Sequence, residues 1–550
     1  MNKIVNKTLS LILSVLLVVP VFPAFSGIIA FAVKGTPDTS WYNAIDLEFE
    51  ISTSDQLAGL AELVNNKIDN FDGKTITLIA DIDLSAYGEY WNVGKGWVPI
   101  GEYEWQNERP FKGIFDGNNK IIDGLFINDS YVGDHTGGAF GTVSGRAGLF
   151  GYIENGTVKD LGVRDCLIQS PAVAGDEYLL ATPLAGGIAA AISSTRIENC
   201  YVKGVVIGSW NVGGLIGSAE ENSIINNSYS NSTVIGDGNL GGLVGGVYGS
   251  SITNSYIIGN VSGSSERIGG VAGYLAFDGN VSNCYVIGSV NGDSNFVGGV
   301  AGDVYGSSVE NCYSVSIVNA GGVYVGGVVG FLTDIWSGDS WNYSSVINCV
   351  ALNPNISGEP ARRVVSCHYG LEGILSGNRA FEDMIVIIND EYCQEIYPID
   401  KGHDKADGED ISKVQTLSAM FWTDTMNWSE EVWDITDGRL PILKNVGGLQ
   451  TTGIISVAPD TNNNQVTVNL ISPWTSDAVL IVAVYNDQKL LRIKTKPITQ
   501  SGNIIVEDIE IPVVEGTVVK AMMWNNTSDM VPLCEAKAKV MHDDNWDDIL

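Results

Sequence analysis

The stretch Gly213-Gly214-Leu215-Ile216-Gly217 is one copy of a phrase that returns along the middle of the chain. Its first glycine recurs at steps of 27 to 29 residues, in copies that begin at Gly186 (a variant), Gly213, Gly241, Gly269, Gly298 and Gly326. A second phrase, Asn-(Cys/Ser)-Tyr, lies between successive copies and begins at Asn199, Asn227, Asn254, Asn283 and Asn311. Two phrases that keep step over five periods indicate a solenoid, in which each repeat stacks on the next.

The composition of the repeat decides which kind of solenoid to expect. The repeats are rich in Gly, Ser, Asn, Val and Ile and poor in the residues that favour helices. Short runs of β-branched residues broken by Asn-Gly and Gly-Ser steps predict short strands joined by tight turns. We therefore predict an all-β fold, a right-handed parallel β-helix with about 4.8 Å between coils.

The alignment of repeats predicts where each side chain points. An aliphatic residue precedes each Cys or Ser by three positions and should face inward: Ile197, Ile225, Ile252, Val281 and Val309. The Asn between them suits the left-handed conformation of a turn, after which the small Cys or Ser points in and the Tyr points out. The paired glycines mark a corner where a Cβ atom would clash or where φ is positive.

The tyrosine row is the candidate ligand-binding surface that this alignment predicts. If the side chains face solvent, five rings stack at coil spacing into a strip about 20 Å long: Tyr201, Tyr229, Tyr256, Tyr285 and Tyr313. Aromatic faces can bind sugar rings or partner proteins. The alternative is a ladder stabilised by its own neighbours or covered by loops.

With this period, the glycine phrase resembles the GLUG-motif repeats of bacterial surface proteins. Ala147-Gly148-Leu149-Phe150-Gly151 fits as an earlier copy, and the lead-in at Trp97–Gly101, Phe111–Asn118 and Ile122–Leu125 fits as well. The resemblance covers roughly residues 50 to 445 and is specific for architecture. It implies a β-helix of the kind found in some adhesins, and in some relatives beside protease domains.

The remaining domain boundaries follow from changes in composition and hydrophobic pattern along the chain. We predict a signal peptide (1–32), a linker (33–50), an N-terminal cap and first coils (51–155), GLUG-type repeats (156–350), last coils and a C-terminal cap (351–445), a linker (446–455), an immunoglobulin-like β-sandwich (456–541) and an acidic tail (542–550). A capping helix begins after Thr53, with Leu57, Leu60 and Val64 at helical spacing. The sandwich resembles a module at the C-terminus of secreted clostridial-type proteins.

Export and charge set the expected location and partners. Lys3 and Lys7 precede an apolar run that Pro20 and Pro23 interrupt, which favours a cleaved signal over a membrane anchor. No other long apolar segment follows, so we expect no transmembrane span in the mature chain. The net charge of -34 becomes -36 without the two lysines, which argues against nucleic acid or anionic membranes as partners. We expect an extracellular glycan or a surface protein of a host or neighbouring cell instead.

Cysteines and histidines give little support for disulfide or metal chemistry. Cys200, Cys284, Cys312 and Cys349 occupy the position that Ser takes in other repeats, which predicts buried free thiols. No His-Glu-x-x-His motif is present, so a zinc protease of that kind is not expected. Four acidic residues lie near His403: Asp404, Asp407, Glu409 and Asp410. They form either a solvated loop or a calcium site, and we expect no other cofactor.

Parallel β-helices also carry polysaccharide lyases and glycoside hydrolases, so acid–base groups need inspection. The carboxylates of the repeats fall mostly at predicted turns: Glu198, Asp237, Asp278, Asp293, Asp303 and Glu310. The basic residues among the repeats, Arg164, Arg196, Lys203 and Arg267, occupy different repeat positions. We therefore predict no catalytic residues and a secreted or cell-surface adhesion or carbohydrate-binding protein. A β-helical polysaccharide lyase or glycoside hydrolase is the alternative, carried by fold analogy alone.

Overall fold

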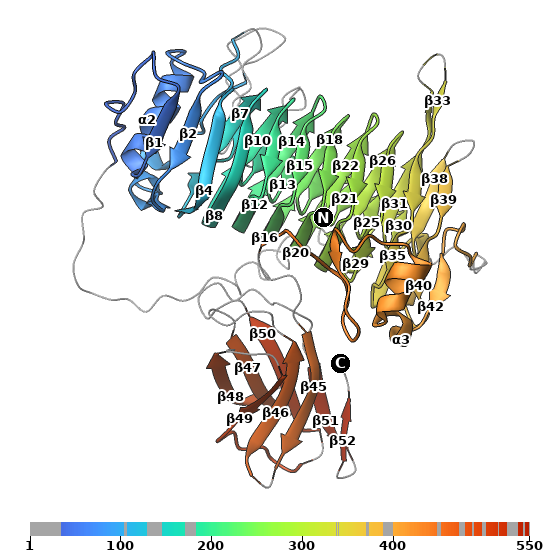
Figure 1. Cartoon of the computed structure of the whole chain (residues 1–550). Helices are drawn as coiled ribbons and strands as arrows, with labels where there is room; N and C mark the ends of the chain where they lie inside the picture. Colours follow the sequence, from blue (N-terminus) through green and yellow to red (C-terminus); the bar gives the residue numbers. More distant parts are fainter. Residues whose placement is uncertain are drawn as a thin grey trace, which may run out of the picture. The chain divides into compact units, whose positions relative to one another are not determined.

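The chain folds into a stack of parallel coils with a helix at its N-terminal end (Figure 1). The computed structural model describes residues 35–103, 107–128, 146–170, 183–336, 338, 340–369, 373–388, 400–447, 453–461, 463–471, 479–486, 489–497, 502–514, 516–524, 537–542 and 545–548. The predicted signal peptide lies outside these residues. Among the helices in the described ranges, none is long and apolar enough to cross a membrane.

Helix α2 (Ser54–Asn65) lies at the N-terminal end of the solenoid, beside the first coils (Figure 1). Gln56 N–H donates to the Thr53 hydroxyl at 3.2 Å, and the Gln56 side chain accepts from Ser52 N–H at 2.9 Å, so the expected cap forms. Leu57, Leu60 and Val64 are buried in the same core cluster as residues of β1 (Glu48–Ile51), β2 (Thr75–Leu78) and β4 (Ile114–Asp123). Strand β1 begins inside the segment predicted as a linker, because Phe49 and Ile51 belong to the first coil's core.

One coil contains four strands, as in β13 (Trp210–Gly213), β14 (Ile216–Glu220), β15 (Ile224–Asn226) and β16 (Tyr229–Gly236). Each strand pairs in parallel with its counterpart in the next coil. The structure is therefore a parallel β-helix, as the repeat predicts.

Three sheets run along the stack. One contains β7 (Phe150–Glu154), β10 (Ala189–Ser193), β14, β18 (Val244–Tyr248), β22 (Ala272–Ala276), β26 (Ala301–Tyr305), β31 (Val329–Thr333) and β38 (Val365–Tyr369). The second contains β6 (Arg146–Ala147), β9 (Leu184–Gly186), β13, β17 (Gly238–Gly241), β21 (Ile268–Gly269), β25 (Val297–Gly298), β30 (Val325–Gly326) and β37 (Ala361–Arg362). The third, with 24 strands, includes β12 (Tyr201–Gly208), β16, β20 (Tyr256–Gly263), β24 (Tyr285–Gly292) and β28 (Tyr313–Ser314).

The predicted side-chain directions are confirmed in the core. The aliphatic position three before each Cys or Ser is fully buried in all five repeats, at Ile197, Ile225, Ile252, Val281 and Val309. The turn asparagines have φ between 49° and 53°, the left-handed conformation that Asn tolerates: Asn199, Asn227, Asn254, Asn283 and Asn311. These turns place the Tyr of each repeat on the opposite face of the sheet from the core.

The Ser and Cys ladder at the turns faces inward and satisfies backbone groups. The Ser228 hydroxyl accepts from Cys200 N–H, and the Ser255 hydroxyl accepts from Ser228 N–H, each at 3.1 Å. The Cys312 sulfur accepts from Cys284 N–H at 3.4 Å in the same way. A small side chain with an acceptor atom is therefore what this position requires, which explains the interchange of Ser and Cys. Cys200, Cys284, Cys312 and Cys349 are buried free thiols.

Steric contact rather than positive φ explains the first glycine of each pair. A Cβ atom on Gly213 would lie 2.0 Å from the Ile216 carbonyl oxygen, and one on Gly241 would lie 1.9 Å from that of Val244. The chain turns so tightly into β14 and β18 at these points that only glycine fits.

The C-terminal region forms a sandwich of two antiparallel sheets around its own core. Strands β45 (Gly453–Asp460), β46 (Gln465–Ile471) and β49 (Gly502–Val506) form one sheet. The other contains β47 (Val479–Asn486), β48 (Lys489–Pro497), β50 (Val518–Trp524), β51 (Lys537–His542) and β52 (Asn545–Asp548). Val468, Leu480 and Val519 are buried in the core. Strand β52 pairs with β51, so the predicted acidic tail contains a strand.

Candidate functional site

The five tyrosines of the predicted strip form one stacked column. Neighbouring ring centroids lie 4.9 Å apart, and the interplanar angles are 1° to 7°. The rings belong to a hydrophobic cluster separate from the solenoid core, so they point away from that core, as predicted.

Most of this column is not open to solvent. Tyr229, Tyr256, Tyr285 and Tyr313 are buried beneath the C-terminal cap, which we define as residues 412–447. The Tyr313 hydroxyl donates to the Pro441 carbonyl and the Tyr256 hydroxyl to the Gly447 carbonyl, each at 2.9 Å. The exposure that a binding strip requires is therefore absent at these four positions. Tyr201 alone of the five is half-buried, at the end of the column that the cap leaves uncovered.

Three tryptophans explain why the cap covers the column. Trp422, Trp428 and Trp433 are buried, and each has its ring centroid 6.0–6.2 Å from that of Tyr313. All three pack against the outer face of the tyrosines. Apolar rings on both partners lose contact with water together, which stabilises the cap on the column.

A second aromatic surface lies on the outer side of the sheet that runs from β7 to β38. Its rings come from β18, β22, β26 and β31 and from the adjoining corners, with neighbouring centroids 4.8–6.5 Å apart. We call it the aromatic face: Tyr248, Tyr274, Phe277, Phe296, Tyr305, Tyr324 and Phe331. None of these side chains is buried, and Phe277 is 52% exposed.

The segment 334–343 interrupts the coils beside this face. It forms a hairpin of β32 (Ile335–Trp336) and β33 (Trp341–Asn342), which projects from the stack in Figure 1. The Asn342 amide donates to the Gly306 carbonyl at 3.2 Å and to the carboxylate of Asp278, the neighbour of Phe277. Trp336 and Trp341 are 56% and 36% exposed, with ring centroids 5.5 Å apart. The hairpin therefore carries two accessible indoles and is attached beside Phe277.

An ion pair between half-buried Arg267 and buried Asp303 lies within the aromatic face. Arg267 Nε donates to Asp303 Oδ2 at 3.0 Å, and its guanidinium lies 4.6 Å from the Tyr274 ring centroid. Burial raises the pKa of Asp303 to about 6, although Arg267 opposes this shift. Asp303 Oδ1 is sealed from solvent and has no partner among the described residues. Asp303 is thus placed to hold Arg267 in position rather than to reach a substrate.

This pair corrects one expectation. Asp303 was grouped with carboxylates expected mostly at turns, but it lies in β26, in register with Tyr274 and Phe331. The sequence could have placed Asp303 on this face. When the repeats are aligned on the third glycine of each phrase, the next residue is Tyr274, Asp303 or Phe331 in successive copies. Of the other carboxylates, Asp237, Asp278 and Asp293 are exposed, while Glu198 and Glu310 are half-buried.

The raised pKa of Asp303 predicts a pH dependence of stability. The pKa is about 6 in the folded chain against 3.8 as the ordinary value, so the folded state binds more protons between these limits. This contribution makes the protein less stable as pH rises from about 4 to above 6. We expect Asp303→Asn to remove that part of the slope in urea unfolding measured from pH 4.5 to 7.5. Arg267 and Glu266 are the other charged groups that influence Asp303, and parallel curves for both proteins would contradict the assignment.

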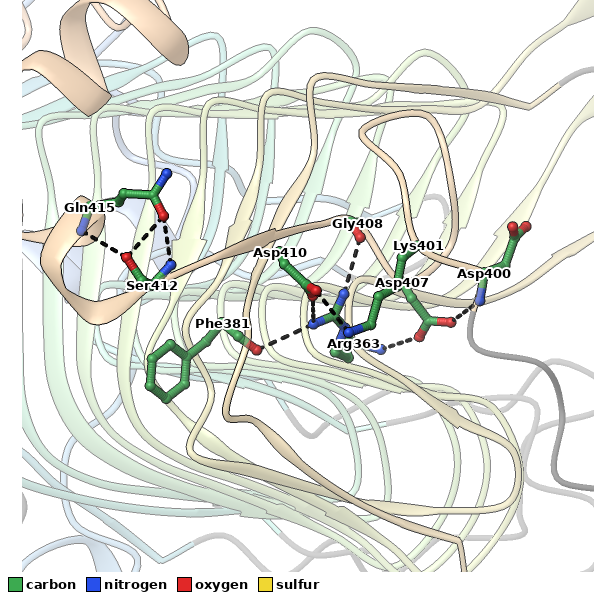
Figure 2. A network of polar contacts seen from close by, with 9 residues as sticks. All are labelled: Arg363, Phe381, Asp400, Lys401, Asp407, Gly408, Asp410, Ser412 and Gln415. Carbon is green, nitrogen blue, oxygen red and sulfur yellow. Dashed lines mark hydrogen bonds and ion pairs between the residues drawn. The ribbon is translucent and has the colours of Figure 1, made fainter.

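The acidic loop considered for calcium forms hydrogen bonds and ion pairs with arginine side chains, of which Figure 2 shows Arg363. Arg363 donates to Asp410 Oδ1 at 2.6 Å and to the Gly408 carbonyl at 3.1 Å. Asp407 accepts from Arg362 and from Arg363 N–H, both at 3.1 Å. These contacts hold the loop against the final coils. Within the described ranges, no group of three or more His, Cys, Asp or Glu side chains is placed to hold a metal ion.

Comparison with known proteins agrees with the repeat architecture. Residues 264–291 match the family described as the GLUG motif. Halomucin of Haloquadratum walsbyi (strain DSM 16790 / HBSQ001) is 31% identical over 188 residues, which are 33% of this chain and 2% of halomucin. A solved structure of IgA1 Protease aligns with 72% of this chain and 25% of its own length, at 18% identity and a TM-score of 0.41. The chain therefore contains a GLUG motif within a parallel β-helix. It spans only a small part of either relative.

Proposed function

We propose that this is a secreted or cell-surface, non-catalytic protein that binds an extracellular glycan along the aromatic face. The supporting observation is the row of partly exposed rings from successive coils, together with the exposed indoles of the nearby β32–β33 hairpin. Sugar rings present flat apolar faces to aromatic side chains, and flanking polar groups fix their orientation. Insertions on a solenoid also tend to lie on its binding face.

Charge favours a neutral polysaccharide as the occupant of this face. A net charge of -34 repels polyanionic chains over the range of the Debye length. The tyrosine row stays a weaker candidate, restricted to Tyr201, which borders a hollow with Asn119, Lys120 and Asp160.

A binding screen with matched variants tests this proposal. Residues 35–550 are applied to a glycan array, and any neutral polysaccharide that binds is then titrated by calorimetry. We expect Phe277→Ala and Trp336→Ala each to weaken binding at least about tenfold, because one aromatic contact at a binding centre is worth about 1.4 kcal/mol or more.

Tyr90→Ala is the control, since Tyr90 is 81% exposed but belongs to the N-terminal region. Its affinity should equal that of the unmodified protein. Equal affinity of all three variants, or release of reducing sugar from the bound polysaccharide, would count against a non-catalytic glycan-binding face.

A further inference from the structure

Arg146 occupies the same repeat position as Arg267, four coils nearer the N-terminal end of the solenoid. It pairs with Leu184 across β6 and β9. In the following coils the position is filled by the residue two before the first glycine, which is Leu184, Asn211, Asn239 and then Arg267. The side chain at this position lies over the outer face of the β7–β38 sheet, as the contact of Arg267 with Tyr274 and Asp303 shows.

The surroundings of Arg146 differ from those of Arg267 in one decisive respect. The Arg146 guanidinium carbon lies 4.3 Å from the Tyr103 ring centroid and 5.8 Å from that of Tyr152. No described carboxylate lies within ion-pair distance, and Nε is sealed from solvent without a hydrogen-bond partner. Tyr152 corresponds to Tyr274, and the residue after it in the next coil is Ala191 where Arg267 meets Asp303, so an apolar side chain takes the place of the carboxylate.

Nearby charges do not compensate for this burial. Glu220 and Glu108 act on Arg146 from a distance, and burial lowers its pKa despite them. A largely buried cation without a bound anion is unfavourable, since desolvation is not repaid by a partner. Arg146 also borders a hollow with Trp97 and Ser170, and the Ser170 hydroxyl is likewise buried without a described partner.

We propose that Arg146 binds a carboxylate group of an extracellular ligand. The two tyrosine rings hold the planar guanidinium by cation–π contact, which leaves its N–H edge for a bidentate carboxylate. A single carboxylate suits the site better than a polyanion, because the chain as a whole is strongly acidic. This site lies apart from the accessible rings of the aromatic face and does not depend on glycan binding there.

Thermal unfolding with three small probes tests the proposal. Sodium glucuronate, sodium acetate and glucose are added at matched ionic strength to residues 35–550. We expect both carboxylates to raise the melting temperature and glucose to leave it unchanged, because a ligand that binds only the folded state stabilises it. A larger rise with glucuronate identifies an acidic sugar as the better source of the carboxylate, and equal rises identify the carboxylate alone.

Arg146→Leu is the informative variant, because Leu fills the same position in the next coil. Its response to both carboxylates should be lost, while its own melting temperature should rise as the uncompensated cation disappears. Arg196→Leu is the control: it removes an exposed arginine that pairs with Glu198 and should keep the full response. An unchanged response in Arg146→Leu, no response in the unmodified protein, or a lower melting temperature of unliganded Arg146→Leu would overturn the proposal.

Discussion

Replacing Tyr285 by alanine should lower the free energy of unfolding by about 3–5 kcal/mol, the range for loss of a large buried ring. Tyr285 is fully buried, stacks at 4.9 Å on both Tyr256 and Tyr313, and lies 6.2 Å from Trp433. Its removal leaves a cavity between the column and the C-terminal cap. Urea unfolding, combined with hydrogen exchange of residues 412–447, measures both the global loss and the loosening of the cap.

Tyr201→Ala is the matched control at the open end of the same column. Tyr201 is half-buried and stacks on one tyrosine only, so its loss should cost clearly less stability. If Tyr285→Ala were as mild as Tyr201→Ala, the cap would not be packed on the column. The strip would then again be a candidate ligand surface.

Replacing Gly241 by alanine should cost about 3 kcal/mol or more, because the added methyl group cannot be accommodated by a side-chain movement. The new Cβ would lie 1.9 Å from the Val244 carbonyl oxygen and 2.6 Å from that of Val271 in the next coil. Both atoms belong to backbone that carries the ladder between coils, so relief requires strands to separate. The expected result is a large fall in melting temperature, measured with circular dichroism at a strand wavelength.

Gly249→Asn provides the comparison within the same coil. Gly249 has a φ of 57°, and Asn adopts this conformation at the neighbouring turns. A new Cβ there would meet only the Phe277 carbonyl, at 3.2 Å. We therefore expect a small change, and a loss equal to that of Gly241→Ala would show that any glycine replacement disturbs the coil.

The repeat made most of the solenoid predictable. A period of 28 residues repeated over several copies gives many aligned observations of one environment, so buried Ile225 and left-handed Asn227 could be assigned from pattern alone. The candidate site was less predictable. Arg267 and Asp303 lie 36 residues apart and meet only because the coil returns the chain to the same face.

By itself, the sequence determined the stacking unit, its strands and turns, and which small residues face inward, because these depend on contacts between neighbouring copies of one pattern. Only the tertiary structure decided that the tyrosine column is covered and that the aromatic face stays partly exposed. The C-terminal cap covers the column. The cap occurs once and has no repeated sequence pattern, so the position where it packs cannot be predicted from periodicity. Tyr256 is buried by a segment 191 residues away in the chain. A pattern within one repeat cannot predict such a contact, because it depends on how the chain folds back.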